Sequence, residues 1–243
     1  MNLYGNYSFG FILVVIAIVH FIRRRPDNYW LWIILMGGGL GALVYICVEV
    51  LPDMGLLRHS FTVFSHRKRI RQLEMMVLDN PSAGNYEELA DLYLEQKKFD
   101  KAKACYDQAI STRTDSPDPF YRRALCEIEL NDFAAAATDL ERVVQKDRNY
   151  DYQRAAGLLA YVWARNNQGA QAASLFEQVT QTSTLSETQF NYAQFLAMQG
   201  KMAEARQWAQ RVLGKKATMP GYLKRRERPW FRRAAALLKK LPT

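Results

Sequence analysis

A repeat of about 34 residues is the feature that most constrains how this chain can fold. An alanine recurs at Ala102, Ala136, Ala172 and Ala205, so the steps are 34, 36 and 33 residues. Each alanine is followed by further apolar or small residues four and seven positions on, which is the spacing of one helix face. Small side chains at such positions let two helices approach closely. The period therefore predicts a row of similar helical units.

The first unit predicts a helical hairpin. Tyr86, Leu89 and Tyr93 lie on one helix face, and Ala102, Tyr106 and Ala109 lie on a second one. The polar run 96–98 separates the two faces and is long enough only for a tight antiparallel turn. Such a hairpin cannot bury its apolar face alone, so it requires neighbouring units.

These spacings resemble the tetratricopeptide repeat family, whose pattern is W-x2-L-G-x2-Y…A-x3-F with a 34-residue period. The resemblance covers about 83–214 and implies four repeats, at about 83–116, 117–150, 153–185 and 186–214. Two positions depart from it, because Glu127 and Ala209 stand where an aromatic residue is usual. The implied fold is an all-α solenoid of four helical hairpins followed by a capping helix.

Two apolar stretches precede the repeats, at about 3–22 and 29–51, with three arginines between them. Each is long enough to cross a membrane, and Tyr29, Trp30 and Trp32 suit the headgroup level. We expect a transmembrane hairpin over 1–56. The alternative is a signal peptide over 1–22, but that stretch lacks a basic start and a small-residue cleavage site before the arginines.

Glycines in the second stretch, 37–39 and Gly41, would present a smooth surface for the first helix. Together with Trp30-Leu31-Trp32 and Tyr45, they resemble the short N-terminal membrane domain of cardiolipin synthases and related phospholipase D proteins. That family carries two copies of H-x-K-x4-D. Here only His66 and Lys68 fit, with Leu73 in place of the acid. The resemblance therefore implies a membrane module without lipid-synthesising activity.

Two basic segments flank the repeats. The segment 57–82 predicts a juxtamembrane helix that packs against the first repeat, and 215–243 predicts a capping helix with Pro229 in its first turn. From Arg211 to Lys240 there are eleven Lys or Arg residues and one acid, Glu227. We expect an anionic lipid or an acidic partner to contact Arg67, Lys68, Arg69, Arg71, Lys224, Arg225, Arg226, Arg228, Arg232 and Arg233. Nucleic acid is disfavoured, because no base-reading motif is present.

Residues for catalysis or metal binding are not grouped in this sequence. The histidines, at 20, 59 and 66, all precede the repeats, and the cysteines are Cys47, Cys105 and Cys126. Cysteines beside apolar residues are usually small buried side chains. No glycine-rich loop is followed by Lys-Ser or Lys-Thr. We expect no enzyme activity, no metal and no cofactor.

Binding is the expected function of the repeats. In the family, the first helix of each hairpin lines a concave groove. The corresponding residues here are Glu87, Glu88, Asp91, Glu95, Tyr121, Arg122, Leu125, Glu129, Arg154, Leu158, Tyr161, Arg165, Phe190, Asn191, Gln194 and Met198. The first repeat lacks the Lys and Asn clamp by which the family's chaperone-tail binders hold a terminal carboxylate. The alternative is that these side chains are solvated and bind nothing specific.

We therefore expect a membrane-anchored adaptor or scaffold that holds a protein or peptide partner at a bacterial-type inner (plasma) membrane. Two alternatives remain open. One is an assembly or quality-control factor for envelope proteins. The other, suggested by the membrane hairpin, is a regulatory subunit of a membrane lipid-synthesising enzyme.

Basic residues near the spans bear on the side of the membrane that the repeats face. The loop carries three, at 23–25, and the repeat side carries five, at Arg58, Arg67, Lys68, Arg69 and Arg71. This favours the repeats in the cytoplasm, as do the unpaired Cys105 and Cys126. The first helix argues for the periplasm, because no basic residue precedes it and three follow it.

Overall fold

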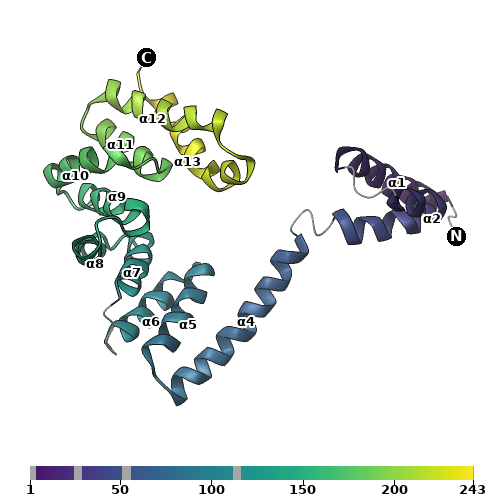
Figure 1. Ribbon diagram of the computed structural model, residues 1–243, viewed down its shortest axis with the longest axis horizontal. Helices are drawn as coiled ribbons and strands as arrows, with labels where there is room; N and C mark the ends of the chain where they lie inside the picture. Colours follow the sequence, from purple (N-terminus) through teal and green to yellow (C-terminus); the bar gives the residue numbers. More distant parts are fainter. Residues whose placement is uncertain (1–3, 25–28, 51–55, 112–115, 243) are drawn as a thin grey trace. The chain divides into compact units, whose positions relative to one another are not determined.

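The computed structural model describes residues 4–24, 29–50, 56–111 and 116–242, and helix is the only regular secondary structure among them. The chain divides into two compact units, Met1–Gln72 and Leu73–Thr243, and Figure 1 shows the order of the helices along it. The predicted span ends at residues 3 and 51, and the end of the first repeat at 112–115, lie outside the described residues.

The first unit contains α1 (Tyr4–Arg24), α2 (Tyr29–Tyr45), a π-helical turn η1 (Ile46–Val50) and most of α4 (Leu56–Asp79). Helices α1 and α2 pack together around Ala17, Trp30, Ile34, Ala42 and Tyr45, which are buried. By length and composition, Tyr29–Glu49 could cross a membrane, whereas Gly10–Ile22 is a shorter apolar stretch. Among the residues described, Tyr29–Glu49 is the only helix that is long and apolar enough to cross a membrane, and Gly10–Ile22 is the only shorter apolar helix.

Polar side chains of the first unit are bonded to one another. The Nε1 of Trp30 donates to Glu49 over 3.1 Å, and Nδ1 of His20 lies 2.9 Å from the hydroxyl of Tyr45. These bonds join α1 to α2 and the start of α2 to η1, so polar groups in an apolar setting are satisfied.

The glycines of α2 have two roles. A methyl group added at Gly39 would lie 3.1 Å from the α-carbon of Gly10, so these two residues let α1 and α2 approach closely, as expected. Gly38 has φ 53° and ψ −131°, which interrupts the helix. Only glycine adopts such backbone angles readily. All of these glycines were expected at the helix contact, and the apolar pattern does not reveal the interruption at Gly38.

The second unit is a row of helical hairpins. They are α5 (Ala83–Glu95) with α6 (Phe99–Ser111), α7 (Asp118–Glu129) with α8 (Phe133–Lys146), α9 (Tyr150–Arg165) with α10 (Gly169–Thr182), and α11 (Ser186–Met198) with α12 (Met202–Thr218). The four repeat alanines, Ala102, Ala136, Ala172 and Ala205, are fully buried. The prediction of four hairpins in this register is confirmed.

The start of the array contacts the end of α4. Leu73 is fully buried, and Glu74 accepts a hydrogen bond of 2.5 Å from the hydroxyl of Tyr93 on α5. The residues of α4 from Leu73 onward belong to the same compact unit as the repeats. This agrees with the expectation that this helix packs against the first repeat.

The array ends in α13 (Gly221–Lys240), which covers the last hairpin. Phe231 and Ala234 are buried in one cluster with Phe190, Ala209 and Val212. The expected cap is therefore present, but Pro229 lies inside the helix and not in its first turn. An interior proline costs one backbone hydrogen bond, and the buried contacts just after it offset that cost. Helix α12 also reaches Thr218, beyond the expected repeat end at 214.

We predict that Ala102→Trp lowers the unfolding free energy by about 1–3 kcal/mol or more, because the site has no room for a larger side chain. The matched control is Ala104→Trp on the same helix, where the side chain is exposed. Urea unfolding followed by circular dichroism measures both variants. Equal midpoints for Ala102→Trp and the control would contradict the packing described here.

Candidate functional site

The first helix of each hairpin, here called an inner helix, carries the expected groove residues. The inner helices are α5, α7, α9 and α11. Tyr121, Arg154 and Glu187 occupy one register position in three successive repeats, each 33 residues from the next. The Nε of Arg154 donates to Glu187 over 2.6 Å, and one of its terminal nitrogens donates to the Tyr121 hydroxyl over 3.2 Å. Arg154 therefore links three inner helices.

Tyr121 is buried, and its hydroxyl donates to Asp151 over 2.7 Å. Burial raises the pKa of Tyr121 well above its ordinary value, so the hydroxyl stays protonated and remains a donor. Asp151, Tyr152 and Gln153 have φ angles of 48°, 55° and 66°, in the left-handed region. This conformation is costly for residues other than glycine. This left-handed turn is the segment that carries Asp151, the acceptor of the Tyr121 hydrogen bond.

A second link joins the first two inner helices. Arg122 donates to Asp91 over 3.0 Å, and the buried Tyr106 donates to the same carboxylate over 2.5 Å. Asp91 is therefore part of the packing between repeats and not a freely available acid. The pKa of Glu87 is raised by partial burial and by the neighbouring carboxylates of Asp91 and Asp118. Glu88 and Glu95 remain exposed on this helix.

The middle of the inner face keeps several exposed charges. Arg122, Glu129 and Arg165 are exposed, and the guanidinium of Arg165 lies 4.9 Å from the ring centroid of Phe133. Leu125 is half-buried and Leu158 is buried. Exposed groups of both signs therefore alternate with apolar side chains along the inner helices.

The last repeat offers less open surface than expected. Phe190 and Asn191 are only 8% and 7% exposed. Phe190 packs against Trp230 of α13, with ring centroids 5.9 Å apart. The capping helix therefore leaves little of Phe190 open, although Phe190 still lines a cavity with Gln194 and Arg233, and burial leaves little of Asn191 accessible.

Helix α13 itself contributes to the surface beside the last inner helix. Tyr161 and Gln194 line a cavity of about 400 Å³ together with Arg233 and Lys240 of α13. Met198, at the end of α11, is 62% exposed. The first repeat thus presents carboxylates, and this cavity presents cationic groups.

The predicted lipid or acidic-partner contacts form two sets. Arg67, Lys68 and Arg71 are exposed and Arg69 is half-buried, all on α4. On α13, Lys224 is half-buried, and the exposed residues are Arg225, Arg226, Arg228, Arg232 and Arg233. Three of the basic residues near the apolar stretches have side chains outside the described part of the chain: Arg23, Arg24 and Arg58.

Glu127, which stands in place of an aromatic residue, is 2% exposed in a charge cluster between α6, α7 and α8. Lys103 lies 3.3 Å from it. Arg123 binds Asp139 and Asp107, each over 2.7 Å. Burial, with the Asp139 charge, raises the pKa of Glu127 to about 7. This cluster replaces apolar packing with paired charges.

The three cysteines differ in burial. All are free; Cys126 is fully buried as expected, Cys105 is half-buried and Cys47 is exposed. Burial raises the pKa of Cys126 to about 12, which disfavours its reactive thiolate form. Among the residues with a described position, no group of three or more His, Cys, Asp or Glu could hold a metal ion.

Family models described as tetratricopeptide repeat match residues 89–180 and 186–220. Among solved structures, YrrB, described as a TPR protein with an unusual peptide-binding site, has a TM-score of 0.55 at 17% identity, covering 68% of this chain and 86% of its own. MamA has a TM-score of 0.57 at 15% identity, covering 66% and 94%.

A third solved structure contains nearly identical TPR-like repeats of a putative kinesin light chain from Podosopora anserina. Its TM-score is 0.54 at 18% identity, covering 70% of this chain and 97% of its own. A search of curated proteins found no match. At these identities the solved structures support the fold of the array alone.

Sequence reasoning missed Asp151 and Glu187. Glu187 had a signal, because it follows Arg154 by the same 33 residues that separate Arg154 from Tyr121. Asp151 had none, because its position depends on the left-handed turn. The structure joins Tyr121 to Arg154 by a hydrogen bond, and it leaves Phe190 and Asn191 mostly buried.

We predict that the stability of the wild-type protein falls relative to that of Glu127→Gln as pH rises from about 4.5 to about 7. The raised pKa means that the folded state holds the proton through this window while the unfolded state loses it. Across this window the unfolding free energy of the wild type should fall by on the order of 3 kcal/mol relative to the variant, because each pKa unit corresponds to about 1.4 kcal/mol. Urea unfolding of both proteins at several pH values measures it, and parallel pH profiles would contradict it.

Proposed function

Since the chain is a tetratricopeptide repeat protein, we propose that it is a membrane-anchored, non-catalytic scaffold that binds a partner protein or peptide through its inner helices. This proposal rests on one observation: some side chains on the inner helices join adjacent repeats, and others are exposed. Arg154 bonds to both Tyr121 and Glu187 and thereby joins adjacent repeats. Neighbouring charged side chains remain exposed to a partner.

The charge pattern supports an extended partner with both acidic and basic groups. Glu88 and Glu95 lie on the first inner helix, and Arg165, Arg233 and Lys240 belong to the later helices. Charges arranged along a binding surface fix the register of a partner and disfavour wrong partners. The peptide-binding site named in the description of YrrB is in keeping with a peptide as the bound element.

Membrane attachment rests on the first unit. The apolar stretch Tyr29–Glu49 has the length of a membrane span, and its polar groups at Trp30 and Glu49 are bonded to each other. We propose an inner-membrane protein with both apolar helices in the bilayer and the repeats in the cytoplasm. The excess of basic residues on the repeat side supports this orientation.

We predict that a photoreactive amino acid at Glu95 or Glu129 forms a discrete crosslinked product in the native cell. The same amino acid at exposed Gln145, on the second helix of a hairpin, should form none. Glu88→Lys with Glu95→Lys should reduce the product at position 129 at least about fivefold, because the charge field reverses. Blotting and mass spectrometry measure and identify the product.

The matched control for the charge reversal is Asp100→Lys with Glu204→Lys, two exposed acids on second helices. Equal products from Gln145 and Glu129 would argue against binding at the inner helices. An envelope-protein client or a lipid synthase as the crosslinked product would replace the general scaffold by the corresponding specific role.

We predict that a cysteine at exposed position 145, with Cys47, Cys105 and Cys126 replaced by Ala, stays unlabelled by a membrane-impermeant thiol reagent in intact spheroplasts. It should be labelled after lysis, because the repeats face the cytoplasm. A known periplasmic cysteine serves as the positive control. Labelling before lysis would place the repeats in the periplasm.

A further inference from the structure

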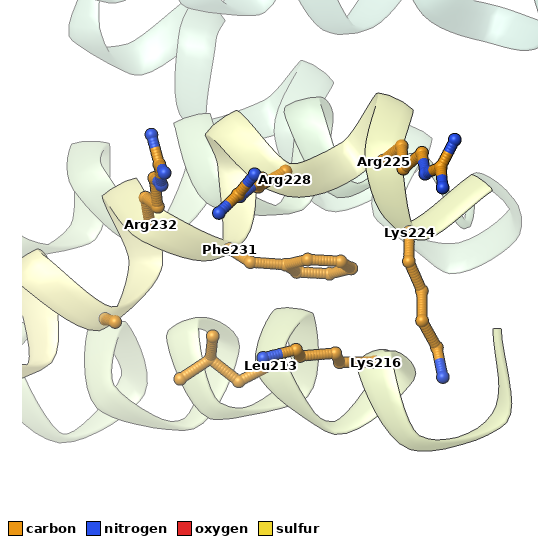
Figure 2. Close-up of a pocket in the computed structure, with 8 residues that line it drawn as sticks. Leu213, Lys216, Lys224, Arg225, Arg228, Phe231 and Arg232 are labelled. Carbon is orange, nitrogen blue, oxygen red and sulfur yellow. The ribbon is translucent and has the colours of Figure 1, made fainter. Parts of the chain in front are cut away.

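A basic groove lies between the last two helices of the array. It has a volume of about 500 Å³ and contains five cationic side chains, Lys216, Lys224, Arg225, Arg228 and Arg232. Figure 2 shows the ring of Phe231 facing Leu213 across the space between α13 and α12. It also shows Arg225 and Arg232 extending away from this apolar pair. The groove therefore has an apolar floor and a cationic rim.

No carboxylate balances these charges locally. Within the described part of the chain, none of the five cations forms an ion pair. Glu227, the acid of α13, does not line the groove, and its charge acts on Lys215. Like charges gathered on one small surface repel one another, so an anion from outside the chain would relieve this repulsion.

The hydrogen-bonding character of the groove restricts that anion. Lysine and arginine side chains only donate hydrogen bonds, and the other lining residues, Leu213, Phe231 and Ala235, have apolar side chains. A ligand that fits must bring acceptors to these cations and an apolar part to the floor, and any donors that it carries must reach water. A phosphate diester attached to hydrocarbon has both properties.

We propose that this groove binds the headgroup phosphate of an anionic phospholipid, with the start of its acyl region against Leu213 and Ala235, which are half-buried. The proposal adds a ligand and a specific site to the scaffold role and does not depend on which partner binds the inner helices. The proposal assigns lipid binding to the cations of the groove and not to Arg226 or Arg233, because these two residues do not line the groove. A bound lipid would attach the last repeat to the membrane surface.

Two other anionic ligands fit less well. An acidic peptide brings a backbone N–H for each residue, and no side chain of the groove can accept a hydrogen bond. Single-stranded nucleic acid binds by stacking bases on exposed aromatic rings. Phe231, the aromatic residue lining the groove, is only 6% exposed, so its face is unavailable to a base.

The test measures lipid binding to the full chain in a nonionic detergent by native mass spectrometry. Dioctanoyl phosphatidylglycerol is titrated against wild type and against Arg225→Gln/Arg228→Gln/Arg232→Gln. We expect the half-saturating lipid concentration to rise at least about tenfold in this variant, since each basic group near an anionic lipid contributes to binding. Dioctanoyl phosphatidylcholine should bind wild type at least about tenfold more weakly.

The matched control is Arg211→Gln/Arg226→Gln/Lys239→Gln, which removes the same charge from exposed positions of α12 and α13 outside the groove. It should change the half-saturating concentration less than about twofold. Thermal melting followed by circular dichroism confirms that both variants fold like wild type.

Equal losses in the two triple variants would overturn the groove assignment in favour of general charge attraction. Competition by inorganic phosphate at the concentration of the lipid would show a simple anion site, and competition by an octaglutamate peptide would show an acidic-peptide site. Either result would overturn the assignment to a phospholipid.

Discussion

Close contact between helices at buried alanines is the constraint on which the rest of the array depends. Ala90, Ala102, Ala124 and Ala136 are fully buried where the first two hairpins pack. Because a hairpin cannot bury its apolar face alone, each repeat is stabilised by the next one. The register set by these alanines also determines which side chains of successive inner helices can meet.

The inner helices show the consequence of that register. Tyr121, Arg154 and Glu187 are equivalent residues of three repeats, and Arg154 contacts both of the others directly. Partly buried charges are tolerated when they are paired and hydrogen-bonded, and the half-buried Arg154 meets this condition through Glu187. A framework that is already bonded needs little reorganisation when a partner binds, which lowers the entropic cost of association. The exposed charges beside it are the ones that a partner can use.

The sequence predicted the repeat period, the hairpins and the buried alanines, because these follow from local apolar spacing. It did not predict features that depend on tertiary contacts. Helix α13 begins at Gly221 despite Pro229, because Phe231 and Ala234 pack on the last hairpin. The same packing covers Phe190. Asp151 reaches Tyr121 from a left-handed turn, and Gly38 interrupts α2, neither of which a helical pattern reveals.

A double-mutant cycle on Arg154 and Glu187 tests most directly whether the repeat register organises the inner face. Arg154→Met, Glu187→Gln and the double variant are compared with wild type by urea unfolding of the full chain in detergent. The account predicts a coupling energy of about 0.5–3 kcal/mol, as found for residues in one hydrogen-bonded network. Additive effects of the two substitutions would contradict it, because they would mean that the two side chains do not hold adjacent repeats together.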